Sequence, residues 1–288
     1  MKEISIIGLG SMGETIARLY LRSGYRVTLW NRTASKAQPL VQEGAVLAPG
    51  AAAAARASAI VLMCVYDYKA ADEILHAQDV GAALAGRLLI QLTTGSPQDA
   101  RDSAAWARQQ DAAYLDGAIQ AAPSQMGQAD TPILVSGDNA VFRRAEAALG
   151  ILGGNIVYLG DKIGSASTMD LATLSYIYGA MLGFMHGARI AESEGIDVAA
   201  YGAVVADISP TFGAFLKHEG GVIQSEDFTI SESPLRISVE ATQRLLQTAR
   251  EAGINSEFPA YASGLLKRAA DAGYGGEELA ALIKVLRQ

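Results

Sequence analysis

The sequence contains little cysteine and little histidine. Its single cysteine, Cys64, excludes an internal disulfide framework and any zinc or iron–sulfur site built from several cysteines. The three histidines, His76, His186 and His218, are far apart in the chain, which argues against a histidine-rich metal site. We therefore expect no metal in the functional site.

Basic residues are also in the minority. The 288 residues include 23 Lys and Arg against 30 Asp and Glu, a formal net charge of −7, which argues against a nucleic-acid-binding protein with a basic face. Half of the residues are hydrophobic and only 18% are charged, so the composition excludes a disordered chain. At about 150 residues per domain, the length indicates roughly two domains.

The N-terminus lacks the features of a secretory leader. Residues Glu3–Ile7 are typical of a β-strand, with no basic stretch, apolar core and cleavage site. The uncharged stretch Leu171–Ala188 has 18 residues, the lower limit for a membrane span, but it contains several polar side chains and three glycines. We interpret it as a helix buried within the protein or in a dimer, and expect a cytoplasmic protein that does not bind membranes.

Short apolar runs alternate with helical patterns through the first 160 or so residues. This alternation predicts right-handed βαβ units and an α/β fold, a Rossmann-type doubly wound sheet. The predicted strands are Glu3–Ile7, Arg26–Trp30, Ser58–Val65, Leu88–Leu92, Tyr114–Ala118, Thr131–Ser136 and Ile156–Leu159. The predicted helices include Gly13–Ser23, a short one at Ala51–Ala55, Tyr68–Ala77, Pro97–Gln110 and Asn139–Leu152.

The strand signal stops after Gly160. A long helix is expected from about Ile163 to Glu194, ended by Gly195, and it joins the sheet to an all-helical C-terminal domain. We place the first domain at residues 1–162 and the second at 163–288. The further expected helices are Ala199–Asp207, Thr211–Glu219, Ser233–Ala252, Pro259–Ala272 and Glu277–Leu286.

A glycine-rich motif follows the first strand and opens a helix. In the run Gly8, Leu9, Gly10, Ser11, Met12 and Gly13, the first glycine allows a tight turn, the second lets the backbone approach a pyrophosphate, and the third lets the helix pack on the strand. The free N–H groups of the helix then face the phosphates. The strand–turn–helix setting favours a dinucleotide site over a glycine turn that serves packing alone.

The end of the second strand indicates which dinucleotide binds. An NAD site usually has an acid there, about 20 residues past the glycines, to hold the ribose 2′-OH. Here the chain has Asn31, Arg32 and Thr33, followed by Ser35 and Lys36, which suit a 2′-phosphate. A solvated loop would also contain such residues, but since the acid is missing we predict NADPH/NADP as the cofactor.

Two later strand ends should complete the cofactor pocket, because ligands bind outside the carboxyl ends of parallel strands. They provide Val65 and Tyr66 after one strand, and Thr93 and Thr94 after the next. Thr94 and Ser96 serve equally well as caps of the helix that starts at Pro97.

These motifs resemble the β-hydroxyacid dehydrogenase superfamily, whose members have a 6-phosphogluconate dehydrogenase-like Rossmann domain. Within it, the segment Leu115–Gly127 (Leu-Asp-Gly-Ala-Ile-Gln-Ala-Ala-Pro-Ser-Gln-Met-Gly) is closer to the imine reductases and reductive aminases. Asp170 stands where the hydroxyacid dehydrogenases have a catalytic lysine, and Tyr178 matches a tyrosine of the reductive aminases. Gln91 departs from the pattern, since the imine-reducing branch often has Asn there.

The two matched residues fit the chemistry of imine reduction. A carboxylate stabilises an iminium ion, and it can donate a proton where burial raises its pKa. Tyr178 would position the amine or supply a proton. Eight residues along a helix place the two side chains within roughly 80° and about 12 Å of rise, so both can line one pocket. In the absence of the resemblance, Asp170 reads equally well as a residue favoured by the helix dipole, and Tyr178 reads better as a core aromatic.

The resemblance implies an NADPH-dependent reductase that transfers hydride to the carbon of a cyclic imine, with reductive amination of carbonyls by amines as a possible extension. It also implies an intertwined homodimer whose active sites combine both subunits. Two other functions remain open from the residues. One is an NADP-dependent β-hydroxyacid or aldehyde dehydrogenase, against which the missing lysine argues. The other is a non-catalytic NADPH-binding protein.

Overall fold

The computed structural model describes residues 2–288 and divides into two units, residues 1–175 and 176–288. Unit 1 contains one sheet of eight strands within the described residues, in the order β3-β2-β1-β4-β5-β6-β7-β8. The strands are β1 Glu3–Ile7, β2 Arg26–Trp30, β3 Val46–Leu47, β4 Ile60–Met63, β5 Leu88–Gln91, β6 Ala113–Ile119, β7 Pro132–Ser136 and β8 Asn155–Tyr158. All neighbouring strands are parallel except the pair β6 and β7, which is antiparallel. The predicted doubly wound fold is therefore confirmed, with one reversal.

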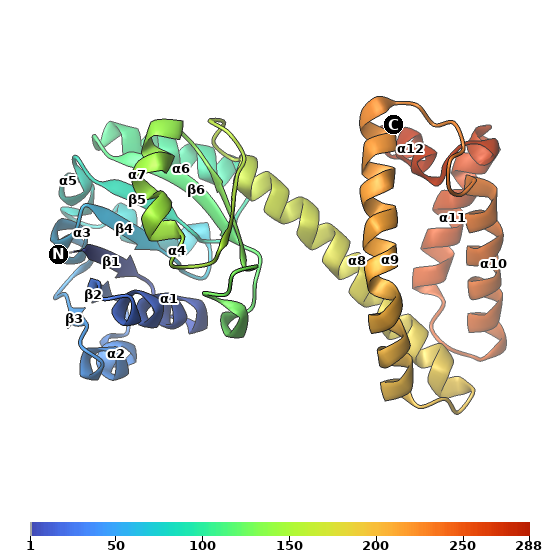
Figure 1. Ribbon diagram of the computed structural model, residues 1–288, viewed down its shortest axis with the longest axis horizontal. Helices are drawn as coiled ribbons and strands as arrows, with labels where there is room; N and C mark the ends of the chain where they lie inside the picture. The colour runs from blue at the N-terminus through green and yellow to red at the C-terminus, as the bar shows by residue number, and fades with distance from the viewer. Residues whose placement is uncertain (1) are drawn as a thin grey trace. The chain divides into compact units, whose positions relative to one another are not determined.

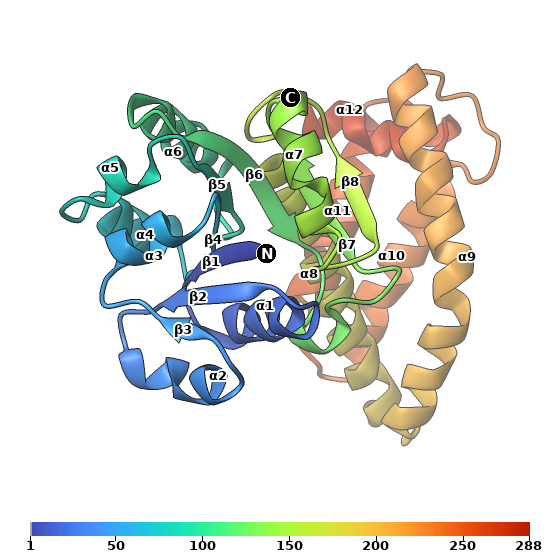
Figure 2. The same cartoon turned by 60° about the vertical axis from the view of Figure 1, so that its left-hand side comes forward.

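Helices cover both faces of the sheet (Figure 1, Figure 2). Successive side chains of a strand point to opposite faces, so Ile6 of β1 packs with one group of helices while Ile7 packs with the other. The first group is α1 Ser11–Arg22, α2 Gln38–Gln42 and α7 Asn139–Leu149. The second is α3 Ala51–Ala57, α4 Tyr68–Leu75, α5 Val80–Leu84 and α6 Pro97–Gln109. The two apolar layers fix the strand ends on which the site is built.

The antiparallel strand β7 was not expected from the alternating pattern. Only 12 residues separate β6 from β7, and the helical element among them is a single turn, Pro123–Gln125. A parallel connection is usually made by a crossover helix, and this segment contains only a single helical turn, consistent with the antiparallel return of the chain.

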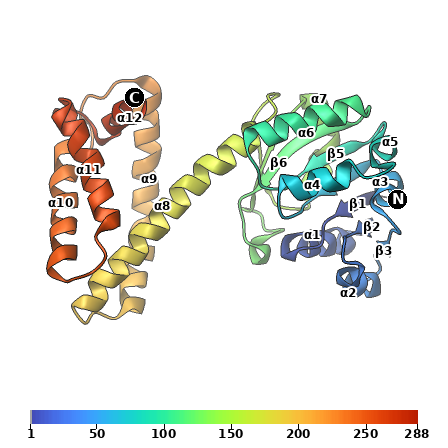
Figure 3. The ribbon, with the colours of Figure 1, turned by 180° about the vertical axis from the view of Figure 1, so that it is seen from behind.

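Helix α8, Ser165–Ser193, continues from unit 1 into unit 2. Gly195 follows its end with φ +72°, as the helix-end signal predicts. Unit 2 is helical (Figure 1, Figure 3). Its other helices are α9 Val198–Ser225, α10 Leu235–Glu251, α11 Glu257–Asp271 and α12 Ile283–Leu286, with short 3₁₀ turns at Tyr274–Gly276 and Leu279–Leu282.

Helix α9 corrects one sequence prediction. We expected two helices, Ala199–Asp207 and Thr211–Glu219, but α9 is continuous and contains Pro210. A proline inside a helix removes one hydrogen bond and does not require the helix to end. Among the described residues, α9 is the helix with the length and mean hydropathy, 1.3, of a membrane span, and none of that window is buried.

The stretch Leu171–Ala188 is not buried within the single subunit. Every residue in it is at least partly exposed, including Leu182 at 61%. Burial inside the chain, one of the two expected explanations, is therefore wrong. Burial in a dimer stays a prediction.

Candidate active site

The glycine loop lies at the carboxyl end of β1 and leads directly into α1. Gly8 has φ +103°, and a Cβ there would stand 2.1 Å from the carbonyl oxygen of Cys64. A Cβ on Gly13 would stand 2.1 Å from the carbonyl oxygen of Gly8, whereas a Cβ on Gly10 would have no atom within 4 Å. Gly8 and Gly13 are therefore needed for packing, and the free space above Gly10 is what a bound pyrophosphate requires.

Asn31 ties the end of β2 to this loop. Its Oδ1 accepts a hydrogen bond of 2.9 Å from the backbone N–H of Leu9, and its Nδ2 donates to the carbonyl of Thr33 at 3.0 Å. The side chain holds the glycine loop against the segment that we expect to bind the 2′-phosphate.

A cleft of about 760 Å³ opens beside the loop. Twelve of the fourteen residues predicted to bind the cofactor line it: Gly8, Leu9, Gly10, Ser11, Met12, Gly13, Asn31, Arg32, Thr33, Lys36, Val65 and Tyr66. Its size, its glycine cradle and its cationic side chains fit a phosphorylated dinucleotide. Sequence reasoning missed Glu73 of α4, whose carboxylate lies 3.8 Å from the Arg32 guanidinium.

The two remaining predicted residues, Thr93 and Thr94, do not line this cleft. Thr93 is buried, and its Oγ1 accepts a hydrogen bond of 3.1 Å from the N–H of Val65, so it supports the cleft wall from behind. Thr94 is exposed. The N-cap of α6 is Ser96, whose Oγ accepts a hydrogen bond from the N–H of Asp99. Of the two residues offered as caps, Ser96 therefore has that role.

Asp170 lies near the start of α8 and is 5% exposed. Its Oδ1 accepts a hydrogen bond of 2.8 Å from Nε2 of Gln120, the residue that follows β6. Burial raises the pKa of this carboxyl above its usual range, the hydrogen bond from Gln120 lowers it, and the negative charge of Asp116 raises it. The structure thus shows a buried carboxyl that is restrained by a hydrogen bond.

Asp116 fixes the first turn of α8. This fully buried side chain accepts hydrogen bonds from the N–H of Ser167 at 3.1 Å and from its Oγ at 2.7 Å. Ser136 of β7 donates to Asp116 and accepts from the N–H of Ala166 at 3.0 Å. Two strands therefore satisfy the otherwise unbonded N–H groups at the start of the helix.

Tyr178 lies on α8 within unit 2 and is 62% exposed in the single subunit. The core interpretation is therefore wrong for this tyrosine. Its hydroxyl forms no hydrogen bond with any of residues 2–288. It is thus free to contact a ligand or another subunit.

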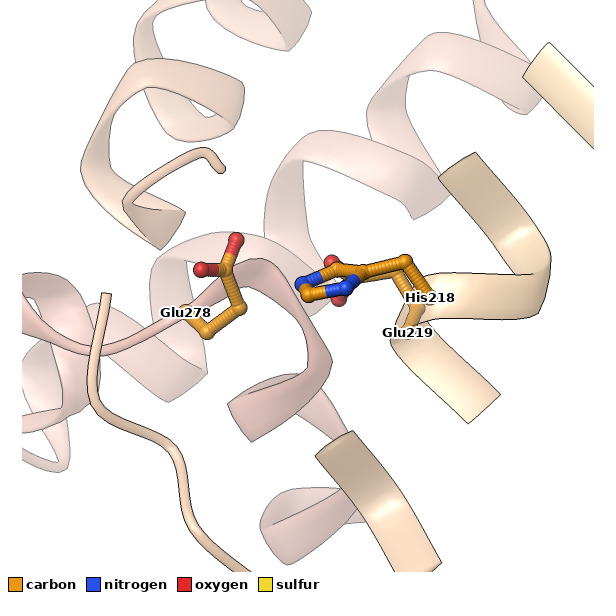
Figure 4. Close-up of side chains that lie close together, drawn as sticks. All are labelled: His218, Glu219 and Glu278. Carbon is orange, nitrogen blue, oxygen red and sulfur yellow. The ribbon is translucent and has the colours of Figure 1, made fainter. Parts of the chain in front are cut away.

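A second cluster of titratable groups lies in unit 2, where the imidazole of His218 points toward Glu278 (Figure 4). Ligand atoms of His218, Glu219 and Glu278 lie within 4.8 Å of one another. Glu278 is already occupied, because its carboxylate accepts four hydrogen bonds from the loop Ser231–Ser233. We interpret the cluster as a support for this loop.

The pKa values of the two glutamates of the cluster are shifted in opposite directions. Burial alone would raise the pKa of Glu278. The hydrogen bonds that its carboxylate accepts from backbone N–H groups outweigh the effect of burial and lower the pKa to about 2. Glu219 is 6% exposed and lies beside Glu278. Burial raises its pKa, the backbone of Ala280 lowers it, and the charge of Glu278 raises it again, so that the net shift is upward.

Glu219→Gln should therefore stabilise the protein at higher pH. The raised pKa means that the contribution of Glu219 is complete below the unfolded value of about 4.3 and is lost as the pH rises through the folded value. Glutamine has the same shape and does not titrate. We expect a melting temperature about 2–4 °C above wild type at pH 8, and a smaller difference at pH 5.

Glu278→Gln is the matched control, with the opposite sign. Its lowered pKa stabilises the fold above the unfolded value, and this stability is lost only as the pH falls toward about 2. The control should melt below wild type at both pH 5 and pH 8. Equal pH dependence in wild type and Glu219→Gln would contradict the assignment.

Together, the doubly wound sheet, the cradle at Gly10 and the cationic strand end define a dinucleotide-dependent oxidoreductase. Residues 3–160 match the model of the NAD binding domain of 6-phosphogluconate dehydrogenase. Residues 162–288 match that of the C-terminal domain of NADPH-dependent reductive aminase-like proteins. The chain belongs to the family of NADPH-dependent imine reductases and reductive aminases.

Relatives of the whole chain agree with this assignment. The NADPH-dependent reductive aminase of Aspergillus oryzae is 31% identical and is matched over 99% of this chain and 97% of its own length. An imine reductase from Myxococcus stipitatus in complex with NADP⁺ is 34% identical, with a TM-score of 0.93 and 99% of each chain covered. A reductive aminase from Aspergillus terreus, in complex with NADPH4, cyclohexanone and allyl amine, is 35% identical, with a TM-score of 0.90 and 99% of each chain covered. The predicted fold, enzyme class and cofactor are confirmed.

Proposed function

We propose that this enzyme reduces cyclic imines, with Asp170 as the residue that stabilises the cationic substrate. The observation that carries the proposal is the buried carboxyl of Asp170, restrained by Gln120. An anion held near the C=N nitrogen favours the iminium ion, and this attraction is strong because little water surrounds the carboxyl.

NADPH, when bound, supplies the hydride. The iminium carbon accepts this hydride, and the C=N bond becomes a single bond to a neutral amine. Because the iminium nitrogen already carries its proton, Asp170 acts in this step by charge. Where the substrate arrives as a neutral imine, a protonated Asp170 or the hydroxyl of Tyr178 is the proposed proton donor.

The proposed cofactor contacts are the twelve cleft residues, with Thr93 supporting Val65 and Thr94 nearby in sequence. The glycine loop and the first turn of α1 would hold the pyrophosphate, and Arg32 and Lys36 the 2′-phosphate. Ligands of the related structures extend the proposal to carbonyl and amine substrates, since the Aspergillus terreus reductive aminase is seen with cyclohexanone and allyl amine.

Arg32→Glu should weaken NADPH about tenfold or more while changing the Kd of NADH by less than about threefold, because the cation serves only the 2′-phosphate. Titration of protein fluorescence with each cofactor measures both constants.

Glu73→Gln is the reciprocal variant. Removing this acid from beside Arg32 should lower the Kd of NADPH and leave the Kd of NADH unchanged. Equal changes for the two cofactors would overturn the proposed role of Arg32.

We also propose a cytoplasmic homodimer. Within unit 2, α8 and α9 expose large apolar side chains that a second copy would bury. They include Ile177, Met181, Leu182, Met185, Val204, Ile208 and Phe212. In this proposal the cofactor-binding domain comprises residues 1–162 and the helical domain residues 163–288. The helical domain provides the dimer contacts and part of the substrate pocket.

The test is NADPH oxidation with a small cyclic imine, beside NADP⁺ reduction with a panel of 3-hydroxy acids. We expect turnover of the imine, faster with NADPH than with NADH. Oxidation of a hydroxy acid without imine turnover would instead identify a dehydrogenase. Binding of NADPH with turnover of neither class would identify a non-catalytic cofactor-binding protein.

A further inference from the structure

We propose that Gln120 is a positioning residue, which holds one oxygen of Asp170 and leaves the other for the substrate. This inference rests on the proposed function. Gln120 follows β6, where its backbone N–H continues the pairing to β7 by donating to the carbonyl of Pro132 at 3.2 Å. Its side chain is therefore presented from a strand end that hydrogen bonds hold in place.

The amide nitrogen of Gln120 donates two hydrogen bonds to α8. Nε2 donates to Oδ1 of Asp170 at 2.8 Å and to Oγ1 of Thr173 at 2.6 Å. These acceptors are three residues apart, so they lie on one face of the helix. Two hydrogen bonds from one planar group restrict the rotation of the amide, and the amide in turn restricts the carboxylate that it contacts.

The contact also acts on the pKa of Asp170. A donor directed at Oδ1 stabilises the carboxylate over the acid, and it lowers the pKa against the effect of burial. Asp116 of β6 is the charged group that acts on Asp170 from the elements packed against it, and it acts in the opposite direction. Gln120 is thus the group that counters both burial and like charge at this carboxyl.

The fixed oxygen has a consequence for substrate choice. With Oδ1 engaged by Gln120, the second oxygen, Oδ2, is the one left for a substrate cation. This favours iminium ions over neutral carbonyl compounds, which gain nothing from a nearby anion. The inference therefore assigns Gln120 a part in selecting charged C=N substrates.

The experiment compares Gln120→Met and Gln120→Glu with wild type over a pH series. Methionine is of similar length and donates no hydrogen bond, so we expect the acidic limb of the kcat/KM profile to move up by about one pH unit. Glutamate replaces the donor by a second carboxyl, whose negative charge would raise the pKa of Asp170 more, so the acidic limb should move further up in Gln120→Glu. At pH 7 we expect kcat with the imine to fall about tenfold in Gln120→Met, with the Kd of NADPH unchanged.

The matched control is Gln98→Met. Gln98 is an exposed glutamine of α6 whose Nε2 donates to Oδ1 of Asp102 at 2.7 Å. The control variant therefore loses the same kind of glutamine–aspartate hydrogen bond, between residues other than Gln120 and Asp170. It should leave the pH profile unchanged. An acidic limb that stays in place in Gln120→Met, or one that moves equally in Gln98→Met, would overturn the assignment.

A readout without turnover separates this inference from the proposed function. In a double-mutant cycle with Asp170→Asn, unfolding by urea should show that Gln120→Met costs less once the carboxylate is absent. Additive effects would reject the coupling of the two side chains, whatever the enzyme reduces. Coupling in a protein that turns over no imine would reject the proposed function and keep the contact.

Discussion

Asp170→Asn is expected to lower turnover of a cyclic imine about 100- to 1000-fold, while the Kd of NADPH stays within about twofold of wild type. Asparagine has the same shape, so the variant removes the negative charge from a site that is 5% exposed and leaves the packing of α8 unchanged. Removing a group whose charge stabilises the transition state reduces kcat and kcat/KM together. Stopped-flow measurement of NADPH oxidation would separate this step from product release.

Asp102→Asn is the control for this experiment. Asp102 is an exposed aspartate that also accepts a hydrogen bond from a glutamine, so its loss tests the same substitution outside the site. Full activity is expected. An Asp170→Asn enzyme that keeps more than about a tenth of wild-type turnover would mean that the carboxyl serves its contact with Gln120 and has no major role in the reaction.

Two alanine variants of the glycine loop should fail in different ways. Gly10→Ala is expected to fold normally and to raise the Kd of NADPH about tenfold or more, because its methyl group occupies the free space that a pyrophosphate needs. Gly13→Ala places a methyl group 2.1 Å from the carbonyl oxygen of Gly8, so the loop must shift. Overpacking of this kind costs about 1–3 kcal/mol, and we expect a melting temperature lower by several degrees.

Thermal unfolding without cofactor, followed by titration with NADPH, distinguishes the two outcomes. Only Gly10→Ala should combine a nearly normal melting temperature with weak binding. If both variants lost stability equally, the loop would serve packing throughout, and the free space above Gly10 would have no assigned ligand.

The local patterns predicted the N-terminal unit well. Strands β1 and β2 have the predicted bounds, and α6 and α7 begin at the predicted residues Pro97 and Asn139. Each of these elements has a clear apolar period, and Pro97 stands at a helix start. Strand β3 was missed because two residues are too few to show any period. Glu277–Leu286, expected as one helix, is a 3₁₀ turn followed by the short α12.

The site was predicted where a motif is local and missed where it depends on tertiary contacts. The glycine loop and the end of β2 line the cleft as predicted from their spacing. Glu73 and Gln120 were missed, because nothing in the neighbouring sequence shows that α4 brings an acid to Arg32 or that a strand end reaches Asp170. Such pairs, 41 and 50 residues apart in the chain, are determined by the fold.

The hydrogen bonds that Asp116 and Ser136 form with the first turn of α8 also set the register of that helix. Asp170 comes three residues after Ser167, so it stands one turn beyond the fixed point, at a height of about 4.5 Å. A slip of one residue would raise the carboxylate by about 1.5 Å and rotate it by about 100°, away from Gln120. An insertion or deletion between Ser167 and Asp170 would therefore misplace an intact Asp170, and length here is constrained as strictly as residue type.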